Sequence, residues 1–139
     1  MQKVFIDVDV CLDLLSGRKP FNESAERIFS LSDQKHLRLY VSSLSFSNID
    51  YILQSHFKIN DARKTLSRFK TLVHVLAVDD KIIDLALTSD FKDFEDAIQY
   101  YTAINHGIEI LVIRNLKDYK KANCKVMSPE MLLKIIQDN

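Results

Sequence analysis

Short apolar runs alternate with helix-like stretches along the chain, and this alternation limits the folds that the sequence can adopt. The apolar runs, which are typical of buried strands, cover residues 4–6, 37–41, 73–78 and 108–113. Between them, apolar residues recur every three or four positions, as they do in amphipathic helices. Strands separated by helices require crossover connections, which produce a parallel sheet with helices on both faces. We therefore predict an α/β fold with three layers, α/β/α, around a central parallel sheet of four to five strands.

Residues that favour helix ends mark where the predicted helices begin. The predicted starts are Asp9, the segment after Pro20, Ser43 or Ser45, Asn60, Asp79, Asp93 and Ser128. Gly17 and Gly107 are expected to end two of these helices, and Gly107 is expected to adopt a left-handed cap conformation.

Length and composition favour one soluble domain that spans residues 1–139. Hydrophobic residues make up 47% of the chain and charged residues 27%, which argues against a disordered segment. Lys and Arg number 19, as do Asp and Glu, so any attraction to phosphate must be local. No stretch approaches the ~18 apolar residues that a membrane span needs, and no signal peptide is visible. We therefore predict a cytoplasmic protein without a membrane partner.

Acidic and amide side chains follow two of the predicted strands. Asp7 comes directly after the first strand, and Asn115 and Asp118 follow the strand that ends near Ile113. In open parallel sheets, ligands bind outside the carboxyl ends of the strands. Because Mg²⁺ is usually held by one or two carboxylates, its own waters and substrate phosphate, this arrangement predicts a metal site.

A second group of acids lies at the start of the helix that begins at Asp93. Asp93 and Asp96 have the spacing of a helix cap and a first-turn acid, and either residue could instead face the metal site. Asp9 has the same two interpretations. The local sequence does not show whether the start of this helix lies at the same edge of the sheet as Asp7.

Four segments, in this order along the chain, resemble the PIN domain family: residues 5–15, 41–53, 93–100 and 112–119. The resemblance covers essentially the whole chain and is to the toxin components of VapBC toxin–antitoxin modules. It implies a Mg²⁺- or Mn²⁺-dependent endoribonuclease that hydrolyses RNA phosphodiester bonds as the toxin of a type II pair. It also implies a homodimer and a partner antitoxin that holds the enzyme inactive.

Carried over position by position, the resemblance also implies which residues form the site. The expected metal ligands are Asp7, Asp96 and Asp118. Asn48 and Asn115 are expected to orient metal-bound water. Independently of the resemblance, Arg114 and Lys117 are basic residues beside the proposed site and are expected to contact the substrate phosphate. Tyrosines could stack on bases or lie in the core; they are Tyr40, Tyr51, Tyr100, Tyr101 and Tyr119.

The chain departs from the family pattern at its opening, where Asp7-Val8-Asp9 stands in place of the usual Asp-Thr-Asn, and at two later positions. Asn48 stands where the family usually carries Glu, and Asn115 stands at an acidic position. These amides leave an alternative open, a non-catalytic PIN-like module that binds RNA or protein and has a degenerate metal site. A phosphoacceptor receiver domain also gathers acids at strand ends, but it expects an Asp after the middle strand, where the residues after Val41 are serines.

Overall fold

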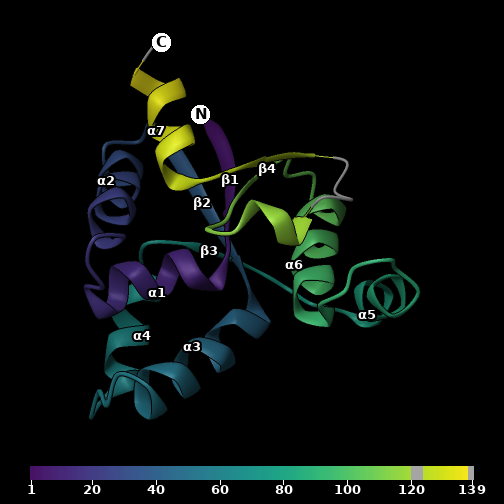
Figure 1. The fold of residues 1–139 in the computed structure, drawn as a ribbon, viewed down its shortest axis with the longest axis horizontal. Helices are drawn as coiled ribbons and strands as arrows, with labels where there is room; N and C mark the ends of the chain where they lie inside the picture. Colours follow the sequence, from purple (N-terminus) through teal and green to yellow (C-terminus); the bar gives the residue numbers. More distant parts are fainter. Residues whose placement is uncertain (120–123, 138–139) are drawn as a thin grey trace.

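The centre of the molecule is a five-stranded sheet in which every neighbouring pair of strands is parallel, in the order β3-β2-β1-β4-β5 (Figure 1). The structure, a computed structural model, describes residues 1–119 and 124–137. The strands are β1 (Gln2–Ile6), β2 (Leu37–Ser42), β3 (His74–Leu76), β4 (Ile110–Val112) and β5 (Lys125–Met127). The prediction of a parallel α/β fold is confirmed, and the predicted apolar runs supply β1 to β4.

Helices cover both faces of this sheet. On one side lie α1 (Val8–Ser16), α2 (Asn22–Asp33), α3 (Ser43–Ser55), α4 (Ala62–Lys70) and α7 (Pro129–Gln137). On the other lie α5 (Asp80–Leu87) and α6 (Phe94–Asn105), and a short 3₁₀ helix, η1 (Leu116–Tyr119), follows β4 (Figure 1). Among the described residues, no helix is both long and apolar enough to cross a membrane.

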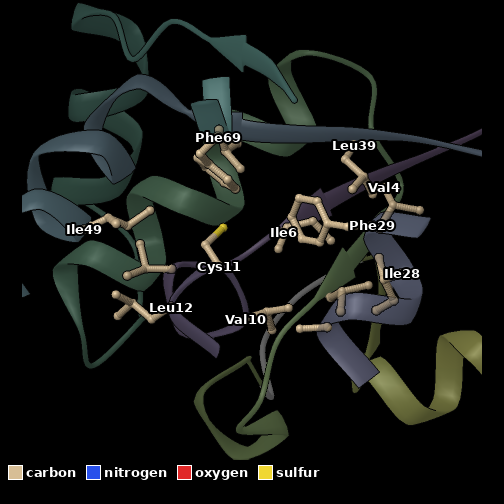
Figure 2. Packing of buried hydrophobic residues seen from close by; sticks show 14 of the residues in the cluster. Val4, Ile6, Val10, Cys11, Leu12, Ile28, Phe29, Leu39, Ile49 and Phe69 are labelled. Carbon is tan, nitrogen blue, oxygen red and sulfur yellow. The ribbon is translucent and has the colours of Figure 1, made fainter. Parts of the chain in front are cut away.

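The hydrophobic core is divided by the sheet, because successive side chains of a strand point to opposite faces. Val4 and Ile6 of β1 pack in the larger cluster with α1, α2, α3, α4 and α7, part of which Figure 2 shows. Phe5, between them in the sequence, packs on the other face with Tyr100 of α6 and Leu111 of β4. The short strands are therefore held by burial on both faces.

The predicted helix ends are largely confirmed. Asp79 and Asp93 cap α5 and α6 by accepting backbone N–H groups, and Ser128 accepts the N–H of Met131 at the start of α7. Gly17 and Gly107 adopt left-handed conformations with φ of 67° and 75°, as residues that end helices commonly do.

Three predicted starts are wrong by one to three residues. Helix α1 begins at Val8, so Asp9 lies in its first turn and does not cap it. Ser42 caps α3 in place of Ser43 or Ser45, because β2 continues into the helix without a loop. Helix α4 is capped by Asp61 in place of Asn60.

The strand that the sequence pattern missed is β5. It has three residues, of which Lys125 is exposed and Met127 is buried, and so short a segment has no readable periodicity. It is held as a strand by its parallel pairing with β4, in which Leu111 lies opposite Val126.

Candidate active site

Asp7 lies at the carboxyl edge of the sheet, directly after β1. Its backbone N–H donates to the Val112 carbonyl oxygen at 3.0 Å, which holds it beside the end of β4. Although Asp7 occupies the cap position of α1, its side chain accepts no capping hydrogen bond. The carboxylate is therefore placed by the strand and is not used to start the helix.

The electrostatic surroundings of Asp7 are strongly acidic. The pKa of Asp7 is raised from 3.8 to about 8, mainly by burial and also by the charges of Asp9, Asp96 and Glu95, while a backbone hydrogen bond with Val8 opposes the rise. Clustered carboxylates disfavour one another's charged forms in this way unless a cation lies between them.

Asp96 comes to the same edge from α6. A helix that leads into a strand of a parallel sheet runs antiparallel to that strand, so the first turn of α6 lies near the carboxyl ends of the strands. The backbone N–H of Asp96 donates to Asp93 Oδ1 at 2.9 Å, and its own Oδ1 accepts the Tyr119 hydroxyl at 3.4 Å. Asp93 is thus the exposed cap of α6. Asp96 is half-buried, and its charge contributes to the raised pKa of Asp7.

Glu95 is a member of this group that the sequence analysis did not select. Burial raises the pKa of Glu95, as do the charges of Asp93 and Asp9, whereas a hydrogen bond with the Asn48 side chain lowers it. Asn48 therefore meets a carboxylate that comes from α6. The only local signal for Glu95 is its place in the acidic segment from Asp93 to Asp96, and adjacent residues of a helix point about 100° apart.

The residues after β4 are not all directed to the acidic group. The Arg114 guanidinium donates to both carboxylate oxygens of Asp13, from Nη2 to Oδ1 and from Nε to Oδ2, the latter at 3.3 Å. It also lies over the Phe21 ring, 4.4 Å from the centroid. Arg18 approaches the same carboxylate, with Nε 3.5 Å from Asp13 Oδ1. Arg114 is thus engaged in an ion pair on the α1 side, and its contact with phosphate stays a prediction.

The other predicted residues of this loop are exposed. Asn115 Oδ1 accepts the backbone N–H of Lys117 at 3.2 Å, and both side chains face solvent. Asp118 lies within η1, but its side chain is outside the described part of the structure.

Two of the tyrosines that could have stacked on bases are buried. Tyr100 is 6% exposed and Tyr119 is 4% exposed, so both belong to the core. Tyr51, which is 71% exposed, is the one of this set with a widely accessible ring.

The protein groups alone do not form a complete metal cage. Among the described side chains, which do not include that of Asp118, no three of His, Cys, Asp or Glu are arranged so that they could hold a metal ion. The pair Asp7 and Asp96 offers hard oxygen donors, and one or two carboxylates fit a cation such as Mg²⁺ that keeps several waters.

Comparison with known proteins places this arrangement in a family. The chain is 28% identical over 137 residues to ribonuclease VapC1 of Aquifex aeolicus, covering 93% of this chain and 92% of that protein. A chain of the DNA-bound VapBC complex of Salmonella typhimurium superposes with a TM-score of 0.68 at 17% identity, covering 92% of this chain and 98% of that one. VapC20 of Mycobacterium tuberculosis, a toxin that cleaves the sarcin–ricin loop, superposes with a TM-score of 0.63 at 19% identity, covering 78% and 86%.

Because both identities are low, the two superpositions show a shared fold alone. The assignment itself rests on the sequence, because residues 3–117 match the family model described as a PIN domain. The chain belongs to the PIN domain family.

Proposed function

We propose that this PIN domain is an endoribonuclease that requires Mg²⁺ or Mn²⁺ and acts as the toxin of a type II toxin–antitoxin pair. The observation that carries the proposal is the meeting of Asp7 and Asp96 at the carboxyl edge of the sheet, where burial and the neighbouring carboxylates together raise the pKa of Asp7. The similarity to ribonuclease VapC1 supports the reaction class.

Asp7 and Asp96 are the residues that would hold the metal. When bound, such a cation supplies an activated water and stabilises the charge that develops on the phosphate. The carboxylates would gain from its arrival, because the mutual repulsion that raises the pKa of Asp7 would be offset.

The remaining site residues have supporting roles in this proposal. Asn48 and Asn115 would orient water molecules, and Asp118 would assist from η1. Lys117 is exposed beside Asn115 and is the better placed of the two predicted phosphate contacts, since Arg114 would first have to leave Asp13.

Partners are proposed on the same basis. The VapBC complex of Salmonella typhimurium supports an antitoxin as the protein partner. Large exposed apolar side chains on α3, α5 and α6 offer surface for an antitoxin or for a second copy in a homodimer; they are Tyr51, Leu87 and Phe94. With RNA as its substrate, the protein would act in the cytoplasm.

The proposed activity is tested by incubating the purified protein with structured RNAs and Mn²⁺. Asp7→Asn and Asp96→Asn are each expected to abolish cleavage. Asp84→Asn removes the same charge from an exposed position on α5 and is expected to cleave like the wild type. Cleavage that survives both site substitutions refutes the assignment.

The alternative of a non-catalytic module depended on the charges lost at Asn48 and Asn115, and the structure bears on the first of them. The hydrogen bond with Asn48 that lowers the pKa of Glu95 supports the presence of a carboxylate from α6 beside this amide. The negative charge expected on α3 is thus present nearby, which favours the catalytic proposal over the degenerate site.

Glu95→Gln is accordingly expected to weaken Mn²⁺ binding by roughly 10-fold, the lower end of the effect usual for groups around a metal site. Adding Asn48→Glu to this variant is expected to restore much of the affinity, because the charge returns from the facing helix. Calorimetric titration with Mn²⁺ measures both changes. Equal affinity in wild type and Glu95→Gln would show that Glu95 contributes nothing to the site.

A further inference from the structure

The Tyr119 hydroxyl lies among the carboxylates of the site although its ring belongs to the core. Tyr119 is 4% exposed, and its hydroxyl donates to Asp96 Oδ1 at 3.4 Å. A phenol is ordinarily protonated near neutral pH, so the Tyr119 hydroxyl is the donor to the Asp96 carboxylate.

The ring is held by its neighbours on the α6 face of the sheet. It meets Phe91 edge to face, with centroids 5.8 Å apart and planes at 75°. It packs in one cluster with Phe5 of β1 and Leu111 of β4, both of which are 1% exposed or less. Because these contacts restrict the ring, they also restrict where the hydroxyl can lie relative to α6.

The hydrogen bond from Tyr119 bears on how the Asp96 carboxylate is oriented. Torsions that end in a carboxylate are broad, so the backbone alone does not determine where its oxygens face. A donor fixed on Oδ1 narrows this range. A phenol is neutral, so it orients the carboxylate without neutralising it, whereas Lys or Arg at this position would compete with a cation for the same charge.

We propose that Tyr119 is a positioning residue for Asp96, whose hydroxyl fixes the carboxylate in the orientation that binds the divalent cation beside Asp7. The inference rests on the proposed function, since it assigns a role within the same site. Hydrogen-bonding partners of metal-binding carboxylates commonly change metal affinity by about 10- to 100-fold when they are removed. A buried tyrosine that serves the core alone would affect stability and leave metal affinity unchanged.

The test is Tyr119→Phe in the full chain, which removes the hydroxyl and keeps the ring. Mn²⁺ affinity, measured by calorimetry, is expected to fall roughly 10-fold, and the electron paramagnetic resonance spectrum of the bound ion is expected to change. Tyr40→Phe is the matched control, because Tyr40 packs against the same cluster and its ring stacks on His74, 5.1 Å between centroids. The control is expected to bind Mn²⁺ like the wild type.

The outcomes separate this inference from the proposed function. Wild-type protein that binds no Mn²⁺ overturns the proposed metal site and the role of Tyr119 together. If the wild type binds Mn²⁺ and Tyr119→Phe binds it with the same affinity and the same spectrum, only the role of Tyr119 is overturned.

A measurement on the wild type covers the case in which Tyr119→Phe does not fold. Titration with diamagnetic Mg²⁺, followed by nuclear magnetic resonance, is expected to shift the Tyr119 ring signals with saturation and to leave the Tyr40 signals in place. Absence of a Tyr119 shift at saturating Mg²⁺ overturns the inference.

Discussion

Asp7→Asn is expected to abolish RNA cleavage and to stabilise the metal-free protein at alkaline pH. The loss of activity follows from removing a carboxylate that would hold the metal, whose stabilisation of phosphate charge contributes several kcal/mol. A loss of about 4 kcal/mol corresponds to roughly a 10³-fold slower reaction. The gain in stability follows from removing a charge that the folded protein disfavours, since Asp7 is half-buried among other acids.

The pH range of this stabilisation follows from the pKa of Asp7, which rises from 3.8 to about 8 on folding. The folded protein binds the proton more tightly than the unfolded chain, so Asp7 lowers the free energy of unfolding progressively as pH rises from about 4 to 8. Each pKa unit corresponds to about 1.4 kcal/mol. Because Asp7 is partly exposed, we expect a loss of about 2 kcal/mol, well below the limit of about 6 kcal/mol that four units would set.

Urea unfolding at pH 5 and pH 9 in the presence of a chelator measures this difference. Wild type is expected to lose stability between the two values by more than Asp7→Asn does, and Asp84→Asn is expected to follow the wild type. When Mn²⁺ replaces the chelator, the stability of the wild type at pH 9 is expected to recover, and the stability of Asp7→Asn is expected to stay the same. Parallel pH profiles for wild type and Asp7→Asn would contradict the assignment of Asp7 to a crowded acidic site.

Asp13→Ala is expected to cause the largest loss of stability among single substitutions near the site. Asp13 is 2% exposed and accepts hydrogen bonds from Arg114, with Arg18 at 3.5 Å. Burial raises the pKa of Asp13, while the hydrogen bond and charge of Arg114 and the charge of Arg18 oppose that rise. Removing one partner of a buried ion pair costs about 3–5 kcal/mol. The arginine side chains are 26% and 31% exposed and can reach water, so we expect about 3 kcal/mol.

Urea unfolding at pH 7 tests this prediction. The double variant Asp13→Leu/Arg114→Met replaces the pair by apolar side chains and is expected to recover at least half of the loss, because no unpaired buried charge remains. Asp33→Ala, at an exposed position on α2, serves as the control and is expected to change stability little. A loss below about 1 kcal/mol for Asp13→Ala, the range of exposed ion pairs, would show that this pair behaves like one on the surface.

Local patterns were sufficient for much of the fold. The apolar runs predicted β1 to β4, and Asp79, Asp93 and Ser128 predicted three helix starts, because periodicity and capping depend on residues within about four positions of each other. The misses share a cause. Strand β5 exists through its pairing with β4, and the start of α1 at Val8 follows from where β1 ends.

The site was predictable only in part. Asp7 could be selected because it follows an apolar strand, and Asp96 because of the family resemblance. The partners of these residues could not be selected, since Asn48 meets Glu95, Asp13 meets Arg114, and Asp96 meets Tyr119 across separations of 23 to 101 residues. The phosphate contact predicted for Arg114 did not take its ion pair with Asp13 into account, because the local sequence around Asp13 does not mark it as a partner.

By itself, the sequence determined a parallel α/β fold, an acid at the carboxyl end of β1 and membership of the PIN family. Only the tertiary structure decided that Glu95 reaches Asn48, that Arg114 pairs with Asp13 and that Tyr119 donates to Asp96. The physical reason is that such contacts depend on the strand order β3-β2-β1-β4-β5 and on which face each helix turns to the sheet. The strand order and the orientation of the helices are set by the burial of the whole core. No short stretch of the chain determines either of them.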